Sequence, residues 1–393
     1  MPKQKIESLA DEIKVPKNEI SPNSKNNEQQ IKKSGLFNIF GKEKSKPGLK
    51  GLKNVGATCY MNATLQCFSN IDKIRANLLE PNYYQFLEKN YNEKTTLTYA
   101  LAEVIKNLWE NLVDKTFSPK FFKEIISKMN PLFQGVAAND PKDLVLFLLM
   151  RIHQETNKIK ENKENLNNNQ LPSPYNFYEI YNDFVQYYTS HNESLISDEF
   201  YGYLNAMTTC FYCRKTIHCV QSFNILFFPL EEVRKFKGYY DYIKIPIMDC
   251  FQYYERFDSY PSFYCNICNC NYPAYNNTKI IKAPKTLIIN LNRGRGLEFN
   301  INVTFNEYLD LRDFICSFDS PNYYELKGVI SHFGSNDDGG HFIAYCKNSN
   351  DCKWYKFNDQ FVEECPFDDV INKGMPYVLF YSHIETQNED DDL

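Results

Sequence analysis

The chain has 393 residues, of which 24% are charged and 43% are hydrophobic, and these values are ordinary for a soluble globular protein. This length exceeds what a single hydrophobic core usually supports, so we expect one large globular unit built from two or three sub-cores. The net charge of −5 excludes a generally basic nucleic-acid binder. The longest wholly apolar run, Leu144 to Met150, is far shorter than the roughly 20 residues that a membrane span needs.

The two ends of the chain differ in composition from its middle. Residues 1–50 contain eleven Lys and six Asp or Glu, a charge of +5 that leaves −10 for the rest. Residues 1–46 hold few apolar side chains, so we expect a disordered N-terminal arm, and residues 386–393 are predicted to form an acidic tail. The N-terminus lacks the apolar segment of a secretory signal. Thirteen Cys residues in such a chain indicate reduced thiols in a cytoplasmic or nuclear protein, used for metal binding or catalysis.

Between these ends, the first apolar residues recur at helical spacing. Examples are Met61, Leu65 and Phe68, then Leu101, Ile105 and Leu108, and then the run from Leu144 to Ile152. A helix is predicted to start at Pro141, because Asn139 or Asp140 can cap it and proline suits its first turn. From about residue 200, short β-type runs dominate, at 286–291, 328–333, 342–346 and 377–381. The predicted fold class is α+β, with a helical lobe followed by an antiparallel sheet region.

Cys59 is the first candidate for catalysis. It follows a loop marked by Gly51 and Gly56 and directly precedes the helix-spaced residues, so it is predicted to lie in the first turn of a helix. The unpaired N–H groups and the dipole at such a position favour an anion, and they lower the pKa of a thiol toward the reactive thiolate. The alternative is a buried structural cysteine, which is the commoner role of a lone cysteine.

A cysteine nucleophile needs a base, and His341 is the best placed of the six histidines. It follows two glycines, where the backbone can approach a ligand closely, and it opens the predicted strand at 342–346. The alternative is a structural histidine. A second strand is predicted to end at Asn358 and Asp359. If the two strands pair through a turn at 349–350, Asn358 lies opposite His341, whereas one extra turn residue would select Asp359.

Two C-x-x-C pairs, Cys210 with Cys213 and Cys265 with Cys268, form a second group of candidate residues. Such pairs present four thiolates from two tight turns, which is the arrangement that a tetrahedral structural Zn²⁺ requires. The 51 residues between the pairs imply that intervening strands bring them together. We predict one structural zinc ion. Cys270 is an alternative ligand to Cys268, and redox chemistry of one pair is the competing interpretation.

Several segments, taken together and in order, resemble the ubiquitin-specific proteases, which are papain-like cysteine proteases that remove ubiquitin. The segment GLKNVGATCYMNATLQ (51–66) is similar to the Cys box of this family. The segment YELKGVISHFGSNDDGGHFIAYC (324–346), with WYKFND (354–359) and PYVLFY (376–381), resembles its His box. FYGYLNAMTTCFYC, YCNIC and APKTLIINLNR fit the segments between the two boxes.

The resemblance covers residues 51–381 and implies both a fold and a set of roles. The implied fold is a papain-like catalytic domain over 51–385, with a helical thumb (51–192), zinc-binding β fingers (193–285) and an antiparallel β palm (286–385). By the matching positions, Cys59 is the nucleophile, His341 the base and Asn358 the third triad member. Asp359 lies beside the triad and is expected to assist it. Asn54 matches the side-chain donor of the oxyanion hole, and the two C-x-x-C pairs match the zinc ligands.

The activity implied is that of a deubiquitinating thiol protease, which hydrolyses the bond after the C-terminal glycine of ubiquitin. The expected partners are ubiquitin and ubiquitinated proteins, with no nucleic acid and no membrane, and the chain is expected to be monomeric. The alternative is a catalytically weak ubiquitin-binding protein of the same fold. The sequence departs from the family at 138–141, which reads Ala-Asn-Asp-Pro in place of Gln-Gln-Asp-Ala, and at Asn290 and Asn292, in place of His and Lys. These departures concern substrate positioning and rate.

Overall fold

A computed structural model of the chain describes residues 45–81, 87, 89, 92–159, 177–293, 300–317, 320–336 and 339–384. All of these residues belong to one unit of the chain. The predicted arm over 1–46 lies outside the described residues except for Ser45 and Lys46, and the predicted tail over 386–393 lies wholly outside them. Across the described ranges, no helix combines the length and the apolar character that crossing a membrane requires.

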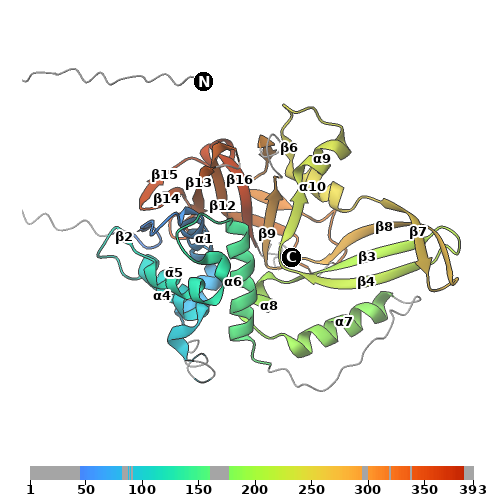
Figure 1. Ribbon diagram of the computed structural model, residues 1–393, viewed down its shortest axis with the longest axis horizontal. Coiled ribbons are helices and arrows are strands. Elements are labelled where there is room, and N and C mark those ends of the chain that lie inside the picture. The colour runs from blue at the N-terminus through green and yellow to red at the C-terminus, as the bar shows by residue number, and fades with distance from the viewer. Residues whose placement is uncertain are drawn as a thin grey trace, which may run out of the picture. The chain divides into compact units, whose positions relative to one another are not determined.

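Helices dominate the first half of the described chain, as Figure 1 shows in blue to green. They are α1 (Cys59–Ser69), α2 (Asp72–Leu79), η1 (Glu93–Thr95), α4 (Leu97–Trp109), α5 (Lys120–Met129), η2 (Pro131–Phe133), α6 (Pro141–Thr156), α7 (Phe177–His191) and α8 (Leu195–Phe200). Further helices among the later residues are α9 (Leu230–Lys237), α10 (Ile247–Tyr254) and α11 (Phe367–Asn372).

The second half is built mainly from strands. The strands of the largest sheet are β5 (Leu226–Pro229), β9 (Thr286–Asn292), β11 (Tyr308–Asp310), β12 (Tyr323–Asn336), β13 (Gly339–Lys347), β14 (Trp354–Asn358), β15 (Phe361–Glu364) and β16 (Met375–His383). Their order in this eight-stranded sheet is β15-β14-β13-β12-β16-β9-β5, and β11 pairs with β12. A four-stranded sheet contains β3 (Gly202–Cys210), β4 (Thr216–Phe223), β7 (Asp258–Cys265) and β8 (Cys270–Lys282), in the order β4-β3-β8-β7. Two short parallel pairs join β1 (Gly51–Leu52) to β2 (Thr116–Phe117) and β6 (Ile245–Pro246) to β10 (Val303–Thr304).

The α+β class is therefore confirmed, and each of the predicted β-type runs lies within an observed strand. The runs at 286–291, 328–333, 342–346 and 377–381 belong to β9, β12, β13 and β16. One pairing at the edge of the large sheet is parallel, that of β5 with β9, and the sequence did not indicate it. Residues 230–285 leave the large sheet between these two strands, and a connection of this length lets the chain return in the same direction.

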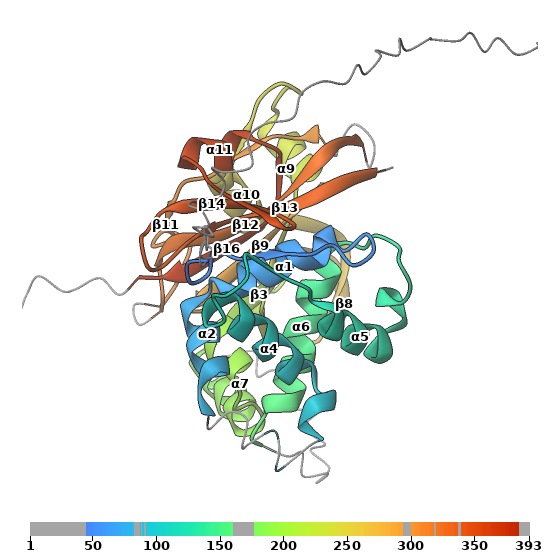
Figure 2. The same cartoon turned by 90° about the vertical axis from the view of Figure 1, so that its left-hand side faces the viewer.

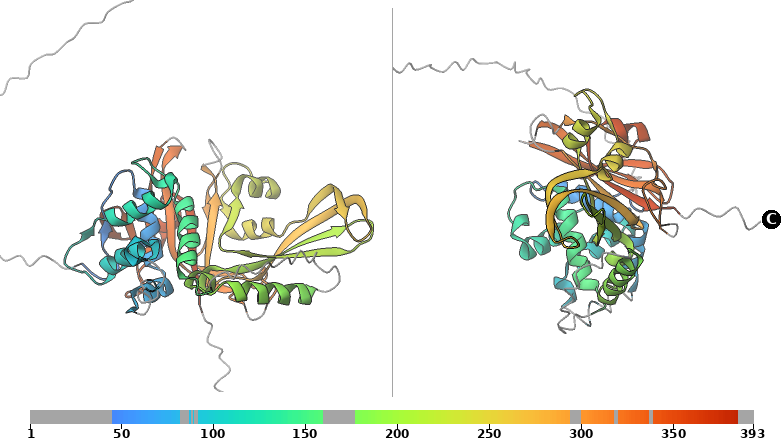
Figure 3. Two further views of the ribbon diagram at one scale, coloured as in Figure 1. Left: turned by 60° about the horizontal axis from the view of Figure 1, so that its bottom comes forward. Right: turned by 90° about the vertical axis from the view of Figure 1, so that its right-hand side faces the viewer.

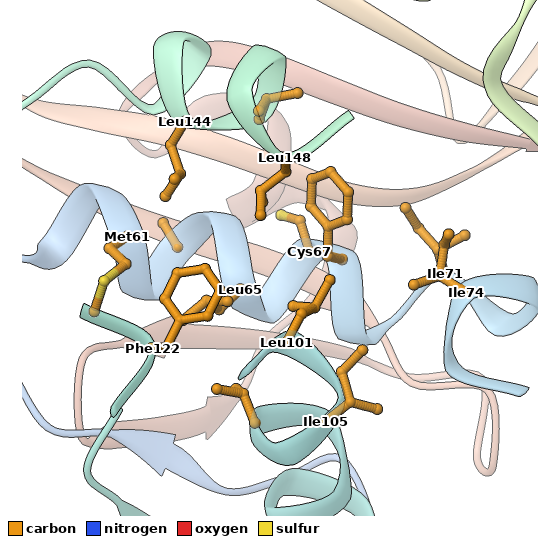
Figure 4. Packing of buried hydrophobic residues seen from close by; sticks show 14 of the residues in the cluster. Met61, Leu65, Cys67, Ile71, Ile74, Leu101, Ile105, Phe122, Leu144 and Leu148 are labelled. Carbon is orange, nitrogen blue, oxygen red and sulfur yellow. The ribbon is translucent and has the colours of Figure 1, made fainter. Parts of the chain in front are cut away.

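Helix α1 lies at the centre of the first hydrophobic core. All of its residues from Cys59 to Ser69 are buried, and Figure 4 shows its side chains among those of the surrounding helices. The labelled residues are Met61, Leu65, Cys67, Ile71, Ile74, Leu101, Ile105, Phe122, Leu144 and Leu148. Truncating a fully buried leucine such as Leu65 to alanine typically costs about 2–5 kcal/mol. This packing fixes the helix, and with it the position of Cys59 at its first residue.

The large sheet covers the other side of α1. Strands β12, β13 and β14 contact the helix, and Figure 2 shows α1 between this sheet and the remaining helices of the first half. Ile330 of β12 and Ala344 of β13 are fully buried in the same core as α1. Because apolar side chains from both layers share one core, helix and sheet are held in a fixed relation.

The four-stranded sheet extends away from α1 and carries α7 along one face, as Figures 1 and 3 show. Tyr203, Val220 and Ile281 form a small core with the apolar side of α7. The helix itself has no fully buried residue. It therefore adds a thin apolar layer to this sheet.

The segment before β1 contacts distant parts of the chain. The Ser45 N–H donates to the Leu112 carbonyl at 3.0 Å, and the Asn348 side chain donates to the Pro47 carbonyl at 3.0 Å. A Cβ atom at Gly48 would lie 2.6 Å from the Trp109 ring, so this glycine is required for the close approach. Contacts with distant residues, which local composition does not reveal, therefore hold this segment, including Ser45 of the predicted arm.

Candidate active site

The loop before α1 is held by the side chain of Asn54. Its Oδ1 atom accepts hydrogen bonds from the Gly56 N–H at 3.1 Å and from the Thr58 N–H at 3.0 Å. Gly56 and Ala57 have φ values of 121° and 44°, which turn the chain sharply into the helix. Helix α1 then begins at Cys59, as predicted, and the Cys59 side chain is 6% exposed.

The electrostatic surroundings of Cys59 differ from the expectation. Burial raises the pKa of the Cys59 thiol, while the Phe342 N–H acts in the opposite direction. The Asp359 carboxylate raises the pKa further, and the N–H groups of Tyr60 and Cys59 lower it. The predicted lowering by the helix N-terminus is wrong because desolvation of the sulfur outweighs the backbone donors. A thiolate at this position therefore needs a proton acceptor beside it.

His341 lies near the start of β13, one residue before Phe342, whose N–H acts to lower the pKa of the Cys59 thiol. Its Nε2 atom is 2.7 Å from Oδ1 of Asn358. An amide oxygen accepts hydrogen bonds, so Nε2 carries the proton and Nδ1 of the neutral ring is the free acceptor. This arrangement leaves one ring nitrogen available as a base.

The predicted register between the two strands is wrong. Ala344 pairs with Phe357 and Lys347 with Trp354, so the turn is longer than the predicted one at 349–350. Continued to His341, this register would set residue 360 opposite the ring, with Asn358 two residues away on the same face. Asn358 still reaches His341, because diagonal neighbours on one face lie within reach of side chains.

Within the described part of the chain, Asp359 makes no hydrogen bond or ion pair with His341. It has a φ of 49°, which turns it out of the strand. Its carboxylate accepts from the Asn54 side chain at 3.0 Å and from the Asn62 side chain at 2.7 Å. Its carbonyl accepts from the Leu52 N–H at 2.8 Å. Asp359 thus ties the loop before Cys59 to the end of β14.

Asn62 is a residue of the site that the sequence did not single out. It lies on α1, three residues after Cys59, and is 2% exposed. Its amide donates to the Asp359 carboxylate and to the Leu52 carbonyl, the latter at 3.3 Å. The signal that could have identified Asn62 is a polar side chain within a helix whose apolar residues recur at helical spacing. An amide buried in such a helix requires hydrogen-bond partners.

The predicted start of α6 is confirmed and adjoins this region. Asp140 caps the helix by accepting from the Lys142 N–H at 2.8 Å, and Pro141 is its first residue. The other carboxylate oxygen of Asp140 accepts from the Tyr377 hydroxyl at 2.6 Å. Asn139 donates to the Tyr60 hydroxyl at 3.3 Å, beside Cys59. The segment that departs from the family pattern therefore links α1, α6 and β16.

The two C-x-x-C pairs meet at one end of the four-stranded sheet. The sulfur atoms of Cys210, Cys213, Cys265 and Cys268 all lie within 4.8 Å of one another. The distances are 4.0 Å between Cys210 and Cys268 and 3.7 Å between Cys213 and Cys265. A tetrahedron with Zn–S bonds of about 2.3 Å has sulfur–sulfur edges of about 3.8 Å, so these residues fit a metal ion of this kind.

Each pair lies in a hairpin turn. Cys210 is the last residue of β3 and Cys213 follows in the turn to β4, while Cys265 is the last residue of β7 and Cys268 follows in the turn to β8. Arg214 and Asn269, which each follow the second cysteine of a pair, have φ values of 58° and 54°. Cys270 is exposed and outside the four-sulfur group. Adjacent hairpins of one sheet thus bring together cysteines that are distant in sequence.

Comparison with known proteins places this geometry in a family. A family model described as ubiquitin carboxyl-terminal hydrolase matches residues 50–381. Human ubiquitin carboxyl-terminal hydrolase 2 is 29% identical over 351 residues, which cover 86% of this chain and 56% of that protein. The chicken (Gallus gallus) protein of the same name is 30% identical over 347 residues, which cover 85% and 93%. The chain thus spans little more than half the length of its human relative.

Solved structures share the fold. A SAGA DUB module of Ubp8, Sgf11, Sus1 and Sgf73, bound to monoubiquitin, aligns with a TM-score of 0.66 at 22% identity, covering 88% of this chain and 72% of that chain. A SAGA DUB module bound to ubiquitin aldehyde aligns with a TM-score of 0.63 at 22% identity, covering 87% and 71%. The family match over 50–381 contains Cys59, His341 and both C-x-x-C pairs. This chain belongs to the ubiquitin carboxyl-terminal hydrolase family.

Proposed function

We propose that this chain is a deubiquitinating thiol protease that hydrolyses the bond after the C-terminal glycine of ubiquitin. The observation that carries the proposal is the 2.7 Å hydrogen bond between His341 of β13 and Asn358 of β14, because both strands contact α1, the helix that begins at Cys59. Family membership supports the reaction, and the related modules that hold ubiquitin and ubiquitin aldehyde support the choice of partner. Ubiquitinated proteins would then be the substrates.

In the proposed reaction, the Cys59 thiolate attacks the carbonyl carbon of the terminal glycine. His341 takes the thiol proton at Nδ1, because its Nε2 atom donates to Asn358, and later delivers that proton to the leaving amine. The C–N bond breaks and a thioester remains on Cys59. Water, deprotonated by His341, attacks the thioester, and Cys59 leaves as a thiolate.

The oxyanion that forms on the glycine carbonyl needs donors that are already in place. An amide NH₂ group carries two hydrogens, and the bond to Asp359 at 3.0 Å uses one of those on Asn54. The second is available to the oxyanion. Loss of one such donor typically costs about 2.7–4 kcal/mol of transition-state stabilisation. Asp359 is therefore assigned to positioning Asn54.

The four clustered cysteines are proposed to hold one structural zinc ion. Four protein ligands leave no open position for a reacting water, so the ion would stabilise the end of the four-stranded sheet. By the family resemblance, this sheet corresponds to the fingers (193–285), the helical region to the thumb (51–192) and the large sheet, apart from β5, to the palm (286–385). We also propose that the enzyme is monomeric and acts in the cytoplasm or the nucleus.

One observation favours a second candidate, a catalytically weak ubiquitin-binding protein of the same fold. Burial raises the pKa of the Cys59 thiol, which disfavours the thiolate unless His341 takes the proton. The two candidates differ in turnover, whereas both bind ubiquitin.

The experiment that separates them uses a ubiquitin with an electrophilic C-terminus and a ubiquitin–fluorophore conjugate. The wild type is expected to be labelled by the first and to hydrolyse the second, and Cys59→Ala is expected to do neither while still binding ubiquitin. Cys316→Ala, which removes an exposed thiol, is the matched control and should behave as the wild type. Turnover by Cys59→Ala would refute the proposal, and wild type that binds without turnover would favour the second candidate.

A further inference from the structure

Gly340, the residue before His341, lies directly against the ring of His332 on the neighbouring strand. A Cβ atom at Gly340 would lie 1.9 Å from Nε2 and 2.2 Å from Cε1 of His332. At Gly339, one residue earlier, a Cβ atom would meet nothing within 4 Å. Neither glycine is among those with a positive φ, so the backbone conformation does not require glycine at either position. The space taken by His332 is what requires glycine at 340.

His332 is packed on several sides. Its side chain is 5% exposed, and its ring makes an edge contact with Phe342, with centroids 4.9 Å apart. Phe342 is also the residue that pairs with His332 across β12 and β13. The ring of His332 therefore touches the residues on both sides of His341 in the chain. One of these, Phe342, supplies an N–H that acts to lower the pKa of the Cys59 thiol.

We propose that His332 is a positioning residue that fixes the course of β13 at His341, so that the imidazole and the Phe342 N–H face the Cys59 sulfur. The inference rests on the proposed function, because it concerns the geometry of the same site. The His332 ring fills the space that a side chain at position 340 would need. Its contact with the Gly340 backbone sets the separation of β12 and β13. A displacement of about 1 Å at a reacting group can cost on the order of 10²-fold in rate.

The charges around His332 are compatible with this role. Burial lowers the pKa of His332, and the positive charges of Arg293 and His341 lower it further. Arg293 is 2% exposed and donates to the Pro376 carbonyl at 2.6 and 2.8 Å. A positive charge on His332 is thus disfavoured, and more so when His341 is protonated, because like charges at close range disfavour one another.

The test compares Gly340→Ala with the matched control Gly339→Ala. The first readout is the rate at which chloroacetamide alkylates Cys59, followed by peptide mapping, because this reaction needs no ubiquitin. The second is kcat and KM for a ubiquitin–fluorophore conjugate. Gly340→Ala should lower the alkylation rate and kcat by on the order of 10²-fold, whereas Gly339→Ala should leave the alkylation rate unchanged. Ubiquitin affinity is measured in the Cys59→Ala background, where no turnover occurs. Adding Gly340→Ala to this background should leave the affinity unchanged.

A second substitution provides the suppressor. His332→Ala removes the ring that the new methyl group would overlap, so adding it to Gly340→Ala should recover about tenfold in alkylation rate. Equal effects of the two glycine variants on alkylation, or no recovery in the double variant, would overturn the proposal. Thermal unfolding monitors folding. If Gly340→Ala fails to fold, His332→Ala alone should lower kcat without changing ubiquitin affinity, and unchanged kcat would also overturn it. Wild type that alkylates at Cys59 but hydrolyses no ubiquitin conjugate would refute the proposed function and not this inference.

Discussion

The Asn54 side chain donates a hydrogen bond of 3.0 Å to the carboxylate of Asp359, across 305 residues of sequence. Asn54 lies in the loop before Cys59, and Asp359 follows the residue that orients His341. The bond therefore joins the segment assigned to the oxyanion hole to the segment that holds the base. Because the same carboxylate also accepts from Asn62 on α1, three parts of the site share one anchor.

This relationship predicts energetic coupling between Asn54 and Asp359. Asn54→Ala removes the oxyanion donor, and Asp359→Ala releases it from position, so each should lower kcat by about 10²–10³-fold or less. The loss of kcat in the double variant should be much smaller than the product of the two single losses, because both substitutions remove the same oxyanion donor. The measurement is a double-mutant cycle of kcat on a ubiquitin–fluorophore conjugate.

Asn54→Ala with Asn358→Ala is the control cycle. Asn358 bonds to the imidazole, at 2.7 Å from Nε2, and not to Asn54, so the two effects should multiply. Multiplicative behaviour of the Asn54 and Asp359 variants would contradict the assignment of Asp359 to the loop. In that case Asp359 would act on His341 or Cys59 by another route.

Metal content provides the next prediction. Protein purified without chelators should contain about one zinc ion per chain, and Cys268→Ser should lower both metal content and melting temperature. Cys270→Ser is the matched control, because Cys270 is two residues away, exposed and outside the four-sulfur group, and it should change neither quantity. Elemental analysis and thermal unfolding check both variants. Equal metal loss in the two variants would exclude the assigned ligand set.

The segment from Ser45 to Lys50 should be required for stability, whereas residues 1–44 should not be required for hydrolysis. Lys50 is 1% exposed and its carbonyl accepts from the Gln66 side chain at 2.9 Å. A chain that starts at Gly51 leaves this buried amide without its acceptor, at a typical cost of about 1–3 kcal/mol. It should unfold at lower denaturant concentration than a chain that starts at Ser45. Identical unfolding midpoints for the two truncated chains would disprove the structural role of the segment.

Stability should fall in mild acid partly because of His153. Burial lowers the pKa of His153, although its hydrogen bond to Asn192 acts in the opposite direction. The unfolded chain binds a proton at this histidine near pH 6.5, while the folded chain binds it only at lower pH. The contribution of His153 to the free energy of unfolding is therefore fully present above about pH 6.5. It is lost as the pH falls through this value toward the pKa of His153 in the folded chain.

The comparison uses His153→Gln, whose amide can still bond to Asn192 and Ser194, the present partners of the ring. Urea unfolding at pH 7.5 and 5.5 should show a smaller loss of stability in the variant than in the wild type. The same loss in both proteins would mean that protonation of His153 does not contribute.

Local signals in the sequence predicted several of the helices and strands of this protein and singled out Cys59 and the C-x-x-C pairs as candidate residues. The start of α1 at Cys59 and the cap of α6 at Asp140 follow from spacing and capping, which act within one helical turn. The C-x-x-C pairs are recognisable because metal ligands require a fixed local spacing. The choice of Asn358 over Asp359 depends on which of the two lies on the same face of the sheet as His341. The predicted and observed registers differ by two residues, so Asn358 lies on that face in both.

Only the tertiary structure decided how these pieces meet, because loop lengths and side-chain packing set long-range contacts. The turn before β14 is longer than predicted, with Cys352 at a φ of 57°, and no local residue signal fixed its length. Asp359 leaves the strand and bonds to Asn54 and Asn62, partners that are near only once β14 reaches α1. Desolvation of Cys59 likewise arises from the packing of helix against sheet, and it reversed the pKa shift that a helix N-terminus alone would give.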